Sequence, residues 1–186
     1  MKLFKIATTI IALSTATAAY ANTDYSGHRV GLGFTSSEVD HLDSDYSNSD
    51  LGNGLKLEYG YDINRIVGVN ISMDTSKDDE NYGYGYGYDS KVSTLKIDSD
   101  IGYAFLLDGF NIKPYGAIGI ARVEEKLTLK EPGGNINLKN TETSLLLGTG
   151  VRANFDFGLY SDLRFNFIMM DDYDIDQLSI TFGYKF

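Results

Sequence analysis

The chain of 186 residues contains no cysteine, no tryptophan, two prolines and two histidines. The missing cysteines exclude disulfide scaffolds, thiolate metal sites and cysteine nucleophiles, and two histidines are too few for a histidine-rich metal cluster. Basic residues are also scarce, because 16 lysines and arginines stand against 26 acids and give a formal net charge of −10. Neutralising phosphates requires clustered positive charge, so this composition argues against nucleic acid as a partner.

Long apolar runs are missing as well, since no segment approaches the ~20 apolar residues that a membrane helix needs. The first segment opens with Lys2 and Lys5, continues through the apolar residues 10–13 and ends on Ala19-Tyr20-Ala21. A basic start, a short apolar stretch and a small-x-small ending are typical of a cleaved signal peptide. We therefore expect residues 1–21 to be a signal peptide, and residues 22–186 to form the single mature domain of an exported protein.

The mature chain shows the two-residue period of β-strands. From Arg29 onward, apolar residues recur at every second position, and helical spacing is not sustained anywhere. The pattern predicts strands at roughly 28–36, 53–61, 65–74, 92–105, 111–123, 142–155, 159–170 and 177–186. Short connections at 62–64, 106–110 and 156–158 alternate with mostly longer ones at 37–52, 75–91, 124–141 and 171–176. We therefore predict an all-β, eight-stranded, antiparallel up-and-down barrel with tight turns at one end and large loops at the other.

The two faces of these strands differ in chemistry. One face holds 38 residues without a charge, from Val30 in the first strand to Phe186 in the last, whereas the interleaved positions hold nine charges and nine glycines. We expect eight of these charges to form a structural ion network in the barrel lumen: Lys56, Glu58, Lys96, Asp98, Asp100, Arg152, Asp162 and Arg164. The ninth is Lys185.

The alternation fits a membrane barrel with its apolar face outward, and equally a soluble lipocalin-like carrier with that face inward. Three features favour the membrane barrel. Glycines make room for long side chains in a narrow lumen, and the polar face is nearly balanced in charge, as burial requires. Aromatic residues of the apolar face also gather near the strand ends, which is typical of interfacial girdles.

The last strand carries the most specific motif. Leu178, Ile180, Phe182, Tyr184 and Phe186 alternate strictly to a terminal phenylalanine, which resembles the signature that the outer-membrane assembly machinery recognises. The segment 114–119, Pro-Tyr-Gly-Ala-Ile-Gly, resembles a strand common in the same superfamily. The mature chain thus resembles the small eight-stranded bacterial outer-membrane barrels of the OmpX/Ail and OmpA transmembrane-domain type.

The resemblance implies a transmembrane barrel in the outer membrane of a Gram-negative bacterium. It also implies a structural role in the envelope or a role in surface interaction, including adhesion. Tyr184 and Phe186 are then the assembly signal. The expected partners are outer-membrane lipid, lipopolysaccharide and the assembly machinery, and we expect a monomer.

The four longer connections are strongly acidic, which favours solubility and repulsion of neighbours. A second interpretation is cation binding by one short loop, in which Asp171, Asp172, Asp174 and Asp176 offer the oxygen ligands that Ca²⁺ or Mg²⁺ prefers. A bound cation would bridge to lipopolysaccharide. No other cofactor is expected.

The only low-complexity stretch, residues 82–88, alternates tyrosine and glycine. It either extends a hairpin above the membrane or forms an adhesive surface of Tyr82, Tyr84, Tyr86 and Tyr88 for a host or cell-surface ligand. A similar extension is indicated in the next long connection, where alternating residues flank a turn at Glu131-Pro132-Gly133-Gly134.

The sequence gives little support for a catalytic function. His41 shares a segment with Asp43 and Ser44, but closeness in sequence does not make a triad. We expect the protein not to be an enzyme. A narrow pore remains the alternative function, followed by the soluble carrier.

Overall fold

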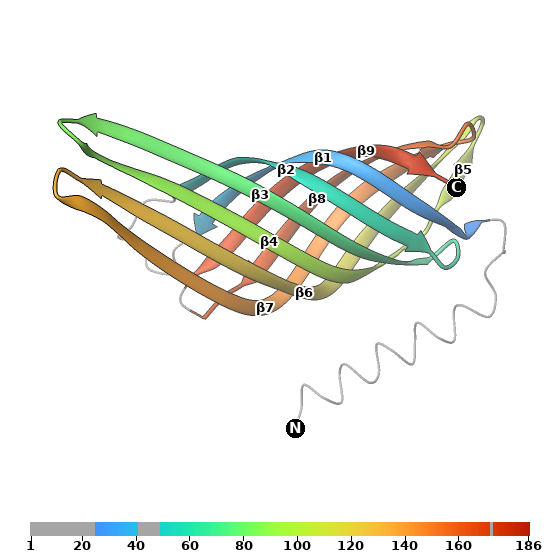
Figure 1. Cartoon of the computed structure of the whole chain (residues 1–186). Coiled ribbons are helices and arrows are strands. Elements are labelled where there is room, and N and C mark those ends of the chain that lie inside the picture. The colour runs from blue at the N-terminus through green and yellow to red at the C-terminus, as the bar shows by residue number, and fades with distance from the viewer. Residues whose placement is uncertain (1–24, 41–48, 172) are drawn as a thin grey trace, which may run out of the picture.

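The computed structural model describes residues 25–40, 49–171 and 173–186. The predicted signal peptide and the segment with His41, Asp43 and Ser44 lie outside these residues. Nine antiparallel strands follow one another along the chain (Figure 1). They are β1 (Gly27–Asp40), β2 (Ser49–Asp62), β3 (Val67–Gly83), β4 (Tyr86–Gly102), β5 (Phe105–Leu107), β6 (Phe110–Glu131), β7 (Gly134–Phe155), β8 (Leu159–Met169) and β9 (Asp174–Lys185). In this described part, no helix is long and apolar enough to span a membrane.

The eight long strands close into a ring. Each pairs with its neighbours along the chain, β1 also pairs with β9, and β4 pairs directly with β6. The remaining strand, β5, is a three-residue segment that pairs only with the start of β6. The prediction of an eight-stranded antiparallel up-and-down barrel is therefore confirmed, with β5 as a small addition inside a connection that the sequence analysis assigned partly to a turn.

The apolar face of the strands points away from the barrel axis. Of the 38 uncharged residues assigned to this face, only Val67 is buried, whereas eight of the nine interleaved charges are buried. The soluble carrier requires the opposite orientation and is therefore wrong. In β6 the register with β7 runs unbroken from Phe110 to Glu131, so no bulge switches the faces of that strand.

Interior glycines make room for large side chains that lie over the neighbouring strands. A Cβ atom on Gly31 would lie 2.2 Å from the Tyr160 hydroxyl, and one on Gly183 would lie 2.5 Å from the Tyr160 ring. A Cβ on Gly150 would similarly lie 2.6 Å from the Tyr115 ring. The barrel is filled by its own side chains, and glycines on the neighbouring strands allow it.

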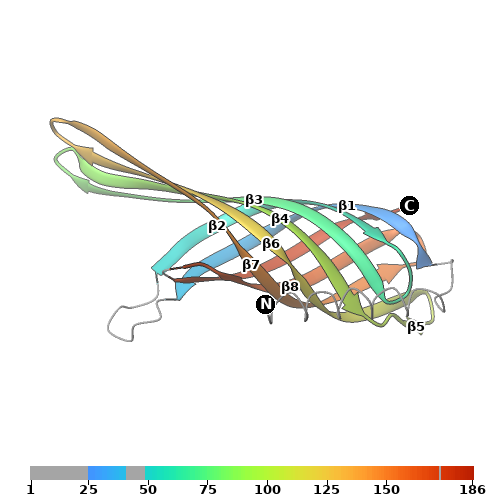
Figure 2. The same cartoon turned by 90° about the horizontal axis from the view of Figure 1, so that it is seen from below.

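Two hairpins extend far beyond the rest of the barrel. The hairpin extensions that the sequence indicated within the long connections 75–91 and 124–141 are confirmed, because β3 and β4 continue to a turn at 84–85, and β6 and β7 to a turn at 132–133. β6 and β7 have 22 residues each, about 73 Å at ~3.3 Å per residue, so half of each strand suffices to cross a bilayer. Both figures show this four-stranded extension leaving the barrel at one end (Figures 1 and 2).

We call residues 77–83, 86–93, 124–131 and 134–144 the projecting sheet. β2 stops pairing with β3 at Ser76, and β8 starts pairing with β7 at Leu145, so both lateral edges of this sheet lack a neighbouring strand within the described residues. Its inner face continues the lumen side of the barrel wall, and its outer face continues the apolar outside.

Candidate interaction surface and barrel interior

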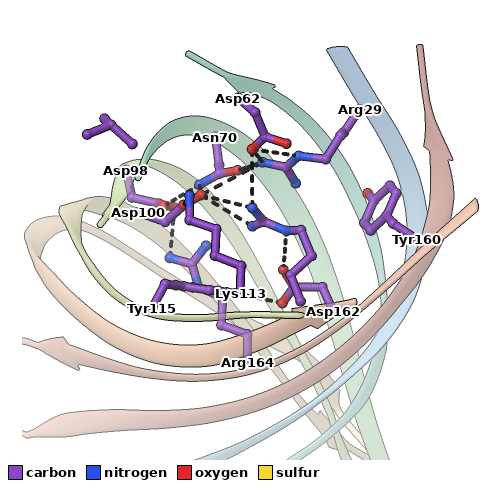
Figure 3. A network of polar contacts seen from close by, with 12 residues as sticks. Arg29, Asp62, Asn70, Asp98, Asp100, Lys113, Tyr115, Tyr160, Asp162 and Arg164 are labelled. Atoms are coloured by element: carbon purple, nitrogen blue, oxygen red, sulfur yellow. Dashed lines mark hydrogen bonds and ion pairs between the residues drawn. The ribbon is translucent and has the colours of Figure 1, made fainter. Parts of the chain in front are cut away.

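Ion pairs occupy the part of the lumen nearer the short turns (Figure 3). All eight charges of the predicted network are at most 4% exposed. Arg152 lies at its centre, since it binds Asp162 at 2.7 Å and Asp100 at 3.2 Å. Three further pairs are Lys56–Glu58 at 2.7 Å, Arg164–Asp98 at 2.9 Å and Lys96–Asp74 at 2.6 Å. This pairing offsets the cost of burying each charge.

Four charged residues of the network were not predicted from the sequence: Arg29, Asp62, Asp74 and Lys113. Arg29 binds Glu58 and Asp62, Lys113 binds Asp100 at 2.5 Å, and Asp74 accepts from Lys96. Each lies at or just beyond an end of the predicted alternating segments, at the lumen parity. Extending the two-residue period by one step at each strand end would have found them.

These carboxylates and cations satisfy one another. Tyr115 donates to Asp162 at 2.6 Å, and Asn70 donates to both Asp98 and Asp100. The interior therefore holds opposite walls of the barrel together, since Arg152 of β7 binds Asp62 of β2 and Asp100 of β4 (Figure 3). Its arrangement is that of a structural network.

The rim at the chain termini is closed by backbone and aromatic contacts. His28 and Phe186 exchange two backbone hydrogen bonds, at 2.8 and 2.9 Å. The His28 ring packs between Phe186 and Tyr61 and shares a hydrogen bond of 2.7 Å with the Tyr59 hydroxyl. Tyr184, the other predicted assembly residue, is half exposed on the outside of β9. The role of Tyr184 and Phe186 in assembly stays a prediction.

The opposite end of the lumen is apolar, which the sequence analysis did not predict. Seven buried side chains cluster there: Val92, Ala121, Val123, Leu146, Ile168, Met170 and Ile175. Leu51 and Tyr173 pack against them. The alternation distinguishes inside from outside but does not report height along the barrel, so this layer is visible only once the strands are in register.

The inner face of the projecting sheet carries apolar and aromatic side chains that are exposed or half-buried. Cross-strand pairing brings them into adjacent rows: Tyr88 lies opposite Leu129, Leu129 opposite Ile136, and Leu127 opposite Leu138. Tyr82 lies beside Tyr88 with 6.3 Å between the ring centroids. We call this surface the inner-face patch: Tyr82, Tyr86, Tyr88, Leu127, Leu129, Ile136 and Leu138.

Acidic residues border this patch on β3. Asp78 accepts a hydrogen bond of 2.8 Å from the Tyr88 hydroxyl, and this bond raises the pKa of Tyr88 to about 12. Glu80 lies opposite Tyr88 in the register of β3 and β4, and Tyr173 donates to Glu125 at the base of the sheet. The tyrosine motif thus forms the end of a hairpin, which confirms the extension, whereas its role as an adhesive surface stays a prediction.

Tyr84 forms the tip of this hairpin in an uncommon conformation. Its φ is 54°, and Gly85 after it has a φ of 84°, which is the two-residue turn that favours asparagine and glycine. A tyrosine in the left-handed region costs about 1–2 kcal/mol. Its side chain is 98% exposed, so no packing within the chain repays this cost.

The outer face of the projecting sheet is basic near the barrel. Lys126 and Lys139 both bind the Glu124 carboxylate, at 2.7 and 2.8 Å. Hydrogen bonds from these two ammonium groups lower the pKa of Glu124 to about 2. Glu124 thus offsets part of the positive charge of these two lysines.

The predicted cation site is only partly described. Asp171, Asp174 and Asp176 lie around the start of β9, where Asp171 donates its backbone N–H to Glu142 at 3.0 Å, and Asp172 lies outside the described residues. The residues that the structure does describe contain no group of three or more side chains placed to hold a metal ion. Because Asp172 lies outside the described residues, cation binding by this loop stays a prediction.

Comparison with known proteins identifies the architecture. The family model described as "Outer membrane protein beta-barrel domain" matches residues 6–186. No curated protein sequence matches the chain. Among solved structures, Ail, the attachment invasion locus protein of Yersinia pestis, has a TM-score of 0.65 at 19% identity, covering 87% of this chain and 99% of Ail. A second Ail structure, in complex with the heparin analogue sucrose octasulfate, has a TM-score of 0.66 at the same identity and coverage.

Neisserial surface protein A has a TM-score of 0.55 at 17% identity, covering 86% of this chain and 97% of that protein. These identities are low, so the solved structures support the fold and do not transfer a ligand. The family match spans almost the whole sequence and agrees with a closed ring whose outer surface is apolar. The chain belongs to the outer membrane protein β-barrel domain family and is located in the outer membrane.

Proposed function

We propose that the protein attaches the cell to another surface through the inner-face patch, with the barrel as its anchor in the outer membrane. The observation that carries this proposal is the exposure of the patch, where Tyr82 is 67%, Leu138 53%, Tyr86 52% and Ile136 47% exposed. Exposed apolar patches of this kind mark interaction sites. Tyrosine adds a large amphipathic contact area at a low entropic cost.

The charge around the patch favours a protein partner. Asp78 and Glu80 border it and Glu125 lies at its base, so a basic or apolar protein surface is complementary to it. The sulfated heparin analogue in one Ail structure is an anion, and an anion is complementary to a basic surface rather than to an acidic one. A sulfated glycan would be repelled by these carboxylates, and attachment through this patch is therefore directed at protein.

The lumen weighs against conduction as the function. A hydrated ion would have to pass the charged network and then the apolar cluster of Leu146, Ile168 and their neighbours, which occupies the lumen at its outer end. Leaving water for an apolar layer is costly for an ion. The proposal therefore assigns the barrel the role of a closed scaffold.

A double serine substitution tests the patch. Tyr82→Ser combined with Tyr86→Ser should reduce attachment of expressing cells to cultured epithelial monolayers at least about tenfold, because truncating two exposed interface tyrosines removes more than ~1.4 kcal/mol of binding free energy. Attached cells are counted after washing, and surface display is measured separately by antibody labelling of an epitope tag.

The matched control lies at the opposite end of the barrel. Leu106→Ser combined with Phe157→Ser removes two side chains of similar exposure, 63% and 65%, from the short turns. This variant should attach like the parent protein. Equal attachment by the Tyr82/Tyr86 variant at equal display would refute the proposal.

Tyr84 separates stability from attachment. Tyr84→Asn keeps a residue that tolerates a φ of 54° and should stabilise the hairpin by about 1 kcal/mol or less, because asparagine adopts this conformation at a lower cost. Attachment should nevertheless fall, since the exposed ring at the tip is lost. Hydrogen exchange at the backbone amides of 81–87 measures the first effect, and the monolayer assay measures the second. Slower exchange with undiminished attachment would remove Tyr84 from the binding surface.

A further inference from the structure

The two faces of the projecting sheet differ in charge. Its inner face, as far as the chain is described, carries five acids and neither lysine nor arginine: Asp78, Glu80, Glu125, Glu131 and Glu142. Its outer face carries five lysines and three acids: Lys77, Lys91, Lys126, Lys130, Lys139, Asp79, Asp89 and Glu124.

The ion pairs of this sheet all lie on the outer face. They join Glu124 to Lys126 and Lys139, and Asp89 to Lys130. Among the residues that the structure describes, the inner-face acids therefore have no cationic partner. A surface with unpaired charge of one sign favours a partner of the opposite sign.

Two of these acids lie beside tyrosine rings at the end of the β3–β4 hairpin. Glu80 lies directly opposite Tyr88, and the Tyr88 hydroxyl donates to Asp78 at 2.8 Å. The ring of Tyr88 therefore extends from a position opposite one carboxylate to the other carboxylate. Hydrogen bonding to Glu80 raises the pKa of Tyr82, whose ring lies beside that of Tyr88 with an angle of 47° between the ring planes. We call Asp78, Glu80, Tyr82 and Tyr88 the acid–tyrosine cluster.

The acid–tyrosine cluster is accessible to another molecule. Glu80 and Tyr82 are exposed, whereas Asp78 and Tyr88 are half-buried. The end of the hairpin lies well away from the barrel in both views (Figures 1 and 2). On the β6 side, Leu129 lies opposite Tyr88 and continues the surface with an apolar side chain. A side chain that reaches the cluster thus meets carboxylates and aromatic rings, with apolar contacts next to them.

This combination of groups attracts a cation. The face of an aromatic ring is electrostatically negative and attracts a cation within about 6 Å of its centroid. Asp78 and Glu80 add full negative charges, and their Cα atoms are about 6.6 Å apart along the strand, at two residues of 3.3 Å each. A cation between them offsets the repulsion of the two carboxylates.

Among the cations of proteins, arginine matches the cluster better than lysine. A guanidinium group is planar, stacks on aromatic rings and donates paired hydrogen bonds to carboxylates. An ammonium group is a compact and strongly hydrated point charge, which cannot stack in this way. The rings of Tyr82 and Tyr88 supply stacking surfaces, and the neighbouring carboxylates supply the acceptors.

We propose that the acid–tyrosine cluster binds an arginine side chain of the partner protein, with the guanidinium stacked on the tyrosine rings and hydrogen-bonded to Asp78 and Glu80. This inference rests on the proposed function and specifies the residue that the inner-face patch recognises. The apolar side chains of the patch then contact the surface around that arginine. Because the outer face is rich in lysine, it repels the same basic surface, so only one side of the sheet takes part in attachment.

A peptide titration tests the cluster without cells. The probe is Gly-Arg-Gly blocked at both ends, and the comparison peptides contain lysine or citrulline, the uncharged analogue of arginine, in its place. Purified protein in phosphatidylcholine nanodiscs is titrated, and the affinity is measured from amide chemical-shift changes of residues 78–88. The arginine peptide should bind at least about threefold more tightly than the lysine peptide. The citrulline peptide should cause no saturable change.

Asp78→Asn is the direct variant, and Asp79→Asn is its matched control, because the same change at the next residue of β3 falls on the outer face. Asp78→Asn should weaken binding of the arginine peptide about threefold, and Asp79→Asn less than twofold. Tyr88→Leu removes a ring and should also weaken binding about threefold, whereas Tyr88→Phe keeps the ring and should stay within about twofold. The amide spectrum of the barrel strands verifies that each variant is folded.

Equal weakening by Asp78→Asn and Asp79→Asn, or equal affinity for the arginine and lysine peptides, would overturn the proposal, because net charge alone would then explain binding. The cell assay judges the proposed function separately. Selective binding of the arginine peptide, combined with normal attachment of the Tyr82/Tyr86 variant, would keep the arginine site and refute attachment through the patch. Loss of attachment in that variant without selectivity among the peptides would keep the attachment surface and refute the arginine site.

Discussion

Replacing Arg152 by methionine is expected to lower the free energy of unfolding by about 3–5 kcal/mol, because it removes one partner from a buried ion network. Arg152 is fully buried and binds three carboxylates, those of Asp162, Asp100 and Asp62. Methionine fills most of the space but leaves the acids with less compensation. Urea titration of the protein in phospholipid vesicles, followed by gel mobility of unheated samples, measures the change.

The three carboxylates are affected unequally, which gives the experiment an internal test. Asp100 keeps Lys113 at 2.5 Å, and Asp62 keeps Lys185 at 2.8 Å. Asp162 keeps the Tyr115 hydroxyl, which donates to it at 2.6 Å, but loses its cation. Adding Asp162→Asn to the Arg152→Met variant should therefore recover part of the lost stability, whereas the same change in the parent protein should be destabilising.

An exposed ion pair provides the control for Arg152. Lys130→Met breaks the Lys130–Asp89 contact of 2.5 Å, whose side chains are 39% and 48% exposed. Exposed pairs of this kind contribute less than about 1 kcal/mol, so this variant should unfold nearly like the parent. If both methionine variants lost the same amount, the lumen network would not be a main source of stability.

The barrel wall was predictable because the alternation within each strand separates its lumen-facing residues from its lipid-facing residues. Lys96 and Arg164 lie within alternating segments, and parity alone assigns them to the lumen. Glycines at the polar positions indicated that this face points into the lumen, since Gly31 and Gly150 make room there for the rings of Tyr160 and Tyr115 from nearby strands. Neither inference requires knowledge of which strand lies next to which.

The pairing of the two hairpins into one projecting sheet was less predictable than the hairpins themselves, because it depends on register between distant segments. Residues 77–81 are charged or polar at every position and residues 82–88 alternate tyrosine and glycine, so neither face resembles a half-buried strand. Lys77 and Lys139 share a row only because three successive pairings align them. The apolar cluster around Leu146 and Ile168 has the same origin, since height along the barrel axis is set by stagger between strands.

Replacing Leu163 by arginine is expected to destabilise the folded barrel in vesicles by about 2–4 kcal/mol, the cost of an arginine near the middle of the bilayer. Leu163 is 52% exposed on the outside of β8, between Val151 of β7 and Ile180 of β9. These neighbours are apolar and offer no partner for a guanidinium. Folded and unfolded fractions across a urea titration give the free energy.

Leu159 provides a control that differs mainly in depth. It lies on the same strand and the same face as Leu163, is 49% exposed, and pairs with Tyr184 near the rim that carries the short turns. Leu159→Arg should cost only about 0–1 kcal/mol, because the guanidinium reaches the headgroups there. Since strand, face, exposure and substitution are matched, the difference between the two variants reports the position of the hydrocarbon layer on the barrel. Equal stabilities would mean that the layer does not cover Leu163, and the assignment of the outward apolar face to lipid would then fail.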